Sequence, residues 1–129
     1  MGAKQVFFMR VSGVLGALAV LTGAFGAHGL ESRLSVEMLE VWETAVKYHF
    51  YHVIPMLALA CAPAPILEKR AAGSAEWLLL VGIVIFSGSL YLLALTEIRW
   101  LGAITPFGGV AFIAGWLAIC FAATARQSG

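Results

Sequence analysis

Four long runs of apolar residues, each free of Asp, Glu, Lys and Arg, alternate with short polar segments along the chain. The runs cover residues 11–30, 48–67, 77–96 and 100–125. A helix needs roughly 20 apolar residues to cross about 30 Å of hydrocarbon, and each run reaches that length. Transmembrane β-strands would instead show segments of about ten residues that alternate between apolar and polar. The pattern therefore predicts an all-α integral membrane protein, a bundle of four transmembrane helices.

The polar segments set the expected ends of the helices. We expect spans at about 6–28, 46–64, 75–95 and 106–125. The last begins at Thr105-Pro106, because Thr is a good N-cap and Pro suits the first helical position. Neither a linker nor an internal duplication is evident. The sequence therefore predicts a single membrane domain over residues 1–129.

The segment between the first two spans has its own helical pattern. Its charged residues recur at helical spacing opposite an apolar face; they are Glu37, Glu40, Glu43 and Lys47. Ser35 is placed to cap this helix, and Leu34 and Leu39 are placed as a hydrophobic staple. We expect an amphipathic helix at about 36–47 that lies near the outer membrane interface and runs directly into the second span.

Composition supports the membrane assignment and excludes one class of partner. Hydrophobic residues make up 61% of the chain and charged residues 12%, against about 45–50% and about 25% in soluble domains. The net charge is +1 and the basic residues form no stripe, so we expect no binding to nucleic acid. The expected partners are the lipid bilayer and, through small-residue helix faces, a second copy or other membrane proteins.

The distribution of basic residues predicts the orientation. With four spans, both termini and the segment after the second span share one side, which carries Lys4, Arg10, Lys69, Arg70 and Arg126. The other side carries three basic residues among five glutamates: Arg33, Lys47 and Arg99. Basic residues near span ends favour the cytoplasm. We therefore expect a multi-pass protein of the bacterial inner (plasma) membrane with both termini cytoplasmic.

Histidines supply the first candidate site. His49 and His52 are three residues apart on one face of the second span, and His28 leaves the first span on the same side of the membrane. Three imidazoles suit Zn or Cu, with Tyr48 or Glu43 nearby. We favour ordinary packing and hydrogen bonding for this cluster. Metal or haem ligation by His28, His49 and His52, and a proton relay, remain open alternatives.

A second candidate site lies at the start of the last span. Thr105, Gly108 and Gly109 belong to a helix start whose backbone N–H groups could hold a carboxylate or a phosphate. A well-formed cap, with glycines for close helix packing, explains the same residues and is the interpretation we favour.

Several of these residues also belong to ordered motifs. The motifs are GAFGAHGL at 23–30, WETAVKYH at 42–49, FSGSLY at 86–91 and TPFGG at 105–109, followed by Gly115-Trp116. In this respect the chain resembles the small membrane proteins grouped as "domain of unknown function 423", which include bacterial YgdD-type proteins and eukaryotic transmembrane protein 256. The resemblance covers nearly the whole chain. It implies a four-helix inner-membrane protein and carries no activity, substrate or cofactor.

The function we infer from the sequence is a non-enzymatic accessory or structural component of the membrane, because no convincing catalytic set is present and the loops are short. No cofactor is predicted. Two alternatives stay open. One is transport or sensing of a small solute, metal ion or proton through the outer-side histidines. The other is a membrane enzyme acting on lipid, which would use the same histidines and Tyr48.

Overall fold

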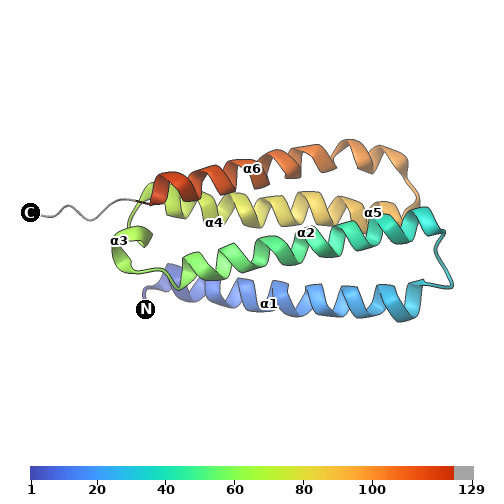
Figure 1. The fold of residues 1–129 in the computed structure, drawn as a ribbon, viewed down its shortest axis with the longest axis horizontal. Coiled ribbons are helices and arrows are strands. Elements are labelled where there is room, and N and C mark those ends of the chain that lie inside the picture. Colours follow the sequence, from blue (N-terminus) through green and yellow to red (C-terminus); the bar gives the residue numbers. More distant parts are fainter. Residues whose placement is uncertain (124–129) are drawn as a thin grey trace, which may run out of the picture.

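Four helical rods lie side by side in the computed structural model, which describes residues 1–123 (Figure 1). The first rod is α1 (Ala3–Phe25) with the short π-helical segment η1 (Gly26–Leu30), and the second is α2 (Val36–Ala60). One turn, α3 (Ala64–Leu67), precedes the third rod, which comprises α4 (Arg70–Gly82), the π-helical segment η2 (Ile83–Ser87) and α5 (Gly88–Thr96). The 3-10 segment η3 (Arg99–Ala103) leads to α6 (Thr105–Ala122). The expected end of the last span at residue 125, and Arg126, lie outside the described residues.

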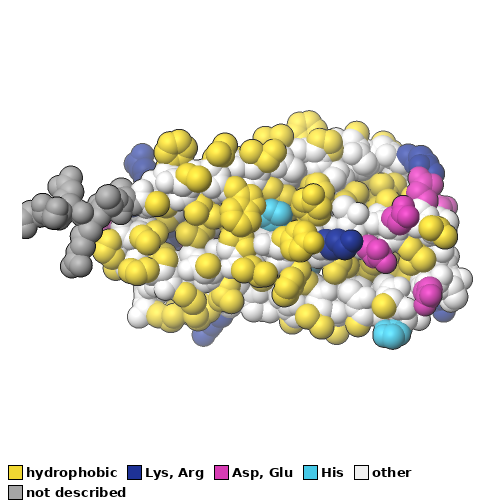
Figure 2. All heavy atoms as spheres, in the orientation of Figure 1, with side chains coloured by type: hydrophobic (Ala, Val, Ile, Leu, Met, Phe, Trp, Pro, Cys, Tyr) yellow, Lys and Arg dark blue, Asp and Glu magenta, His cyan; other side chains and the backbone are white. Residues whose placement is uncertain are grey.

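The two ends of the bundle differ in charge. The N-terminus, α3 and the end of α6 meet at one end, which we call the basic end and define by Lys4, Lys69 and Arg70. The loop before α2 and η3 meet at the other, the acidic end, defined by Glu31, Glu37, Glu40 and Glu97. Figure 2 shows acidic side chains gathered at the right-hand end of the same view. Each rod therefore runs from one end of the bundle to the other, and the described chain begins and ends at the basic end.

Within residues 1–123, three helical stretches are long and apolar enough to cross a membrane: Ala3–Leu30, Arg70–Thr96 and Arg99–Ala122. α2 falls outside this set, and its N-terminal half carries the four charged residues named above. Large apolar side chains also stand exposed along the rods, among them Val14, Leu21, Val110, Ile113 and Phe121. Such an apolar exterior suits lipid rather than water, so the fold is that of an all-helical membrane protein.

The expected amphipathic segment is helical and runs directly into the apolar part of the second rod. Residues 36–47 are the first turns of α2, which continues as one helix through Pro55 to Ala60. The cap prediction is confirmed, since the hydroxyl oxygen of Ser35 accepts a hydrogen bond from the backbone N–H of Met38 at 3.2 Å. The apolar face is buried at Met38, Trp42 and Ala45. That face therefore packs inside the bundle.

The third rod changes its neighbour along its length. α4 packs chiefly on α6, whereas α5 packs chiefly on α2, and η2 lies between the two halves. At this point Gly108 of α6 sits directly against the backbone of Phe86. The absence of a side chain on Gly108 is therefore what lets α6 approach η2 so closely.

Candidate functional site

The first polar cluster joins three helices through Tyr91. The hydroxyl of Tyr91 in α5 lies 2.9 Å from Nδ1 of His49 in α2 and 3.1 Å from the hydroxyl of Thr22 in α1. The Thr22 hydroxyl also donates to the carbonyl of Ala19 at 3.1 Å, and the indole N–H of Trp42 donates to the carbonyl of Thr22 at 2.8 Å. The Thr22 hydroxyl donates to the carbonyl of its own helix, and the Tyr91 hydroxyl donates its one proton to Thr22 or to His49 according to the tautomer of His49. The cluster thus ties α1, α2 and α5 together.

His49 is buried, with 4% of its surface exposed, and its second ring nitrogen, Nε2, has no hydrogen-bond partner in the described chain. The backbone of Leu15 approaches the ring without completing a hydrogen bond to Nε2. The sequence singled out His49 but neither Thr22 nor Tyr91 as its partners. The sequence does show a hydroxyl residue on each of two other predicted spans. Many such hydroxyls are present, however, and only the packing of the helices shows which of them meet His49.

His52 has a different set of neighbours. Its Nδ1 lies 2.6 Å from the carbonyl oxygen of Tyr48; since a carbonyl can only accept, Nδ1 carries the proton. The ring stacks on Phe112 of α6, with ring centroids 3.5 Å apart and planes 8° from parallel, and meets Trp116 edge-on at 5.9 Å. His52 is therefore oriented by its own helix and by aromatic packing on α6.

The expected outer-side cluster does not assemble. His28 is exposed in η1, Glu43 and Tyr48 are exposed on α2, and His49 and His52 turn to different helices. Residues 1–123 contain no group of three or more His, Cys, Asp or Glu side chains that could hold a metal ion. Helical spacing places two residues on one face without deciding which neighbouring helix each one meets, so the sequence left open whether the three imidazoles converge.

The serines and threonines near the start of α6 form a second cluster. Ser87 donates to the carbonyl of Ala45 in α2 at 2.7 Å, and the hydroxyls of Ser89 and Thr105 lie 2.6 Å apart. Thr105 is the first residue of α6, and its side chain makes no capping hydrogen bond, contrary to the expected N-cap. Gly108 packs on Phe86, and Gly109 lies beside the same ring. The contacts of this second candidate site are hydrogen bonds and close packing between helices.

A buried carboxylate at the basic end was missed by the sequence analysis. Glu76 of α4 is 1% exposed, and Nζ of Lys4 in α1 lies 3.4 Å from its Oε2. Neither carboxylate oxygen of Glu76 has a hydrogen-bond partner among the described residues, so Lys4 is its charge partner. The available signal was an acidic residue inside the span expected at 75–95. Ionisable residues at such depth are costly and are commonly paired.

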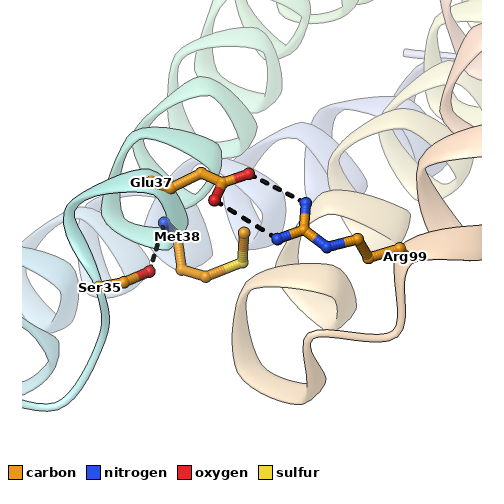
Figure 3. Close-up of polar contacts among 4 residues, drawn as sticks. All are labelled: Ser35, Glu37, Met38 and Arg99. Atoms are coloured by element: carbon orange, nitrogen blue, oxygen red, sulfur yellow. Dashed lines mark hydrogen bonds and ion pairs between the residues drawn. The ribbon is translucent and has the colours of Figure 1, made fainter.

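An exposed ion pair lies at the acidic end. Two nitrogens of the Arg99 guanidinium donate to the two carboxylate oxygens of Glu37, at 3.0 and 3.4 Å, and so tie η3 to the first turn of α2 (Figure 3). The guanidinium lowers the pKa of the Glu37 carboxyl below its ordinary value through these hydrogen bonds and its charge. In turn, Glu37 raises the pKa of Arg99.

Comparison with known proteins gives similarities to membrane proteins of unassigned role. Residues 22–109 match the family model DUF423, described as a protein of unknown function. The chain is 49% identical over 119 residues to the UPF0382 membrane protein YwdK of Bacillus subtilis, covering 89% of this chain and 97% of that protein. It is 54% identical over 113 residues to a UPF0382 membrane protein of Staphylococcus saprophyticus, covering 84% and 92% of the two chains. No solved structure matches.

Proposed function

We propose that this chain, which belongs to the DUF423 family of proteins of unknown function, acts as a non-enzymatic accessory or structural component of the membrane. The observation that carries the proposal is the use made of polar side chains inside the bundle. Ser87, Ser89 and Tyr91 are alternate residues of the third rod: Ser87 is bonded to α2, Ser89 to α6, and Tyr91 to both α1 and α2. Groups used in this way fix the helices relative to one another instead of facing a substrate.

This role predicts that the polar groups contribute to stability. Tyr91→Phe and Ser87→Ala remove hydrogen bonds between helices, each worth about 0.6 kcal/mol in membrane bundles. Each variant is therefore expected to unfold more easily in a detergent titration followed by circular dichroism. Tyr51→Phe and Ser74→Ala are matched controls, since both residues are exposed and neither side chain makes a hydrogen bond to the described residues. Unchanged stability in both test variants would overturn the structural role.

A component of this kind also needs a partner, either a second copy or another membrane protein. Native electrophoresis of membranes dissolved in mild detergent should then place the chain in a complex larger than its 13.7 kDa monomer. Chemical cross-linking before solubilisation serves as the control for losses in detergent. A monomer under both conditions would overturn the accessory role.

We further propose that α2 crosses the membrane as a fourth span. Its 25 residues extend about 37 Å at about 1.5 Å per residue, which exceeds the hydrocarbon thickness. Its C-terminal half exposes Phe50, Ile54 and Leu57, as a lipid-facing helix would. Glu43 and Lys47, which are exposed nearer the acidic end, can direct their charged groups toward the headgroups along their flexible stems.

With four spans, the basic end faces the cytoplasm of the inner membrane under the positive-inside rule. Single cysteines test both the span count and the orientation, in a background that lacks the exposed Cys61 and Cys120. Ser32→Cys at the acidic end should react with an impermeant maleimide in intact cells, and Glu68→Cys at the basic end only after permeabilisation. The reverse result would overturn the orientation. Reaction of both under the same condition would show that α2 does not cross.

The alternatives have less support from the geometry. Transport or sensing through the three histidines requires His28 to approach the other two, and it is exposed in η1. A lipid-acting enzyme requires a base with a free nitrogen facing lipid, whereas His52 stacks on Phe112 and His49 is buried against Tyr91. Loss of a measured flux in Tyr91→Phe without a change in stability would support transport, and loss of a measured turnover would support the enzyme.

A further inference from the structure

A hollow near the basic end combines cationic and apolar walls. Its volume is about 730 Å³, and it lies between the start of α1, α3 and the first half of α4. Lys4, Lys69 and Arg70 line it together with a single carboxylate, Glu68. Deeper along α4, the wall consists of apolar side chains that include Trp77 and Val81. The hollow therefore has a positive rim and an apolar continuation.

Local structure concentrates positive potential at this place. Lys69 and Arg70 stand at the start of α4, where the positive end of the helix dipole has the same sign as their charge. Lys4 reaches the same place from α1, and its Nζ lies directly over Gly73, which has no side chain. One turn further along α4, Glu76 holds Lys4 as described above. Within residues 1–123, neither Lys69 nor Arg70 has an ion-pair partner.

The apolar wall carries an exposed tryptophan. Trp77 is 51% exposed and packs against Phe7 and Phe8, with ring centroids 5.8 and 5.2 Å away. Indole rings of this kind prefer the level of the headgroups. From Arg70 to Val81 the wall extends about 16 Å along α4 at about 1.5 Å per residue. That length is sufficient for a headgroup and the first carbons of an acyl chain.

We propose that this hollow is a binding site for an anionic phospholipid. The phosphate lies between Lys69 and Arg70 at the rim, with Lys4 behind them. The upper part of an acyl chain lies along Trp77 and Val81. A phosphate matches the surplus of positive charge, and basic pockets beside membrane helices are known binding sites for anionic headgroups. The inference goes beyond an accessory role and requires only that the basic end lies at headgroup depth, in either leaflet.

The experiment is a lipid titration of the purified full chain in detergent, followed by native mass spectrometry. The probes are dioleoyl phosphatidylglycerol, dioleoyl phosphatidylcholine and inorganic phosphate. We expect one phosphatidylglycerol to bind at least about tenfold more tightly than phosphatidylcholine. The double variant Lys69→Gln/Arg70→Gln should weaken this binding about 30-fold, which corresponds to about 1 kcal/mol for each basic side chain. Arg33→Gln, an exposed arginine at the acidic end, is the matched control and should bind as the native chain does.

A second variant separates a loss of lipid binding from a loss of fold in the double variant. Ser74→Asp adds a carboxylate to the hollow at an exposed position and should weaken phosphatidylglycerol binding while leaving circular dichroism unchanged. Equal binding of the two lipids would overturn the proposal. So would an equal loss in Arg33→Gln, which indicates general attraction to positive charge. Displacement of the lipid by millimolar inorganic phosphate would show a site for free phosphate instead.

Discussion

Replacing Lys4 by Met leaves the buried carboxylate of Glu76 without its charge partner. Glu76 is 1% exposed, and the Lys4 ammonium is 3.4 Å away. At this distance the attraction between unit charges is about 5 kcal/mol at an effective dielectric constant of about 20. Met retains most of the apolar stem of Lys, so the substitution chiefly removes the charge. The variant therefore isolates the electrostatic cost of a lone carboxylate inside the bundle.

The expected loss is smaller than this attraction. Breaking a fully buried ion pair on one side costs about 3–5 kcal/mol. The Lys4 side chain is 50% exposed, however, and water that reaches it screens the pair and can approach the carboxylate once the ammonium is gone. We therefore expect Lys4→Met to lower the free energy of unfolding by about 1–3 kcal/mol, between the values for surface and buried pairs.

The assay is unfolding of the purified chain in mixed micelles with increasing SDS, followed by circular dichroism. Adding Glu76→Gln to Lys4→Met removes the lone charge and should restore most of the lost stability, which a double-mutant cycle measures as coupling. Lys47→Met, an exposed lysine on α2, is the control and should change little. The reasoning fails if Lys4→Met has native stability, or if the double variant is as unstable as the sum of its parts.

Two other substitutions test contacts between helices. Gly108→Ala should destabilise the chain by about 1–3 kcal/mol in the same titration, because the new Cβ would collide with the backbone of Phe86. Gly88→Ala is its control; space around Gly88 is open, so the better helix propensity of Ala should leave stability equal or higher. The Glu37–Arg99 pair predicts a pH dependence: the pKa of Glu37 is lowered in the folded chain. Its stabilisation is therefore present above the unfolded pKa and disappears as the pH falls through the lower folded value. A carbon-13 NMR titration should show the Glu37 pKa rising toward normal in Arg99→Gln; an unchanged value would contradict the pairing.

Features that depend on neighbouring residues were predictable. The cap at Ser35 needs only the residues that follow it, and the buried face of α2 at Met38, Trp42 and Ala45 follows from helical spacing. Apolar length likewise identified three of the long helical stretches: Ala3–Leu30, Arg70–Thr96 and Arg99–Ala122. These are local properties of a helix, and the sequence contains all the information needed to infer them.

Features that depend on how rods meet were not predictable. The Tyr91 hydroxyl contacts Thr22 and His49, which are 69 and 42 positions away in sequence. The local sequence around each of these residues does not indicate that they meet. The burial of Glu76 also depends on contacts between rods. It lies at the border of an apolar run, and only the approach of Lys4 over Gly73 turns that border position into an internal ion pair.

The π-helical segment η2 has a consequence for the evolution of this chain. A π-turn holds one residue more than an α-turn, and one residue corresponds to about 100° of rotation around the axis. That rotation accompanies the change of neighbour from α6 to α2 along the third rod. Deleting one residue from 83–87 would permit a regular α-helix of better intrinsic geometry, yet it would turn Ser89 and Tyr91 away from Thr105 and Thr22. Natural insertions and deletions should therefore accumulate in the loops, while the length between Gly82 and Tyr91 stays constant.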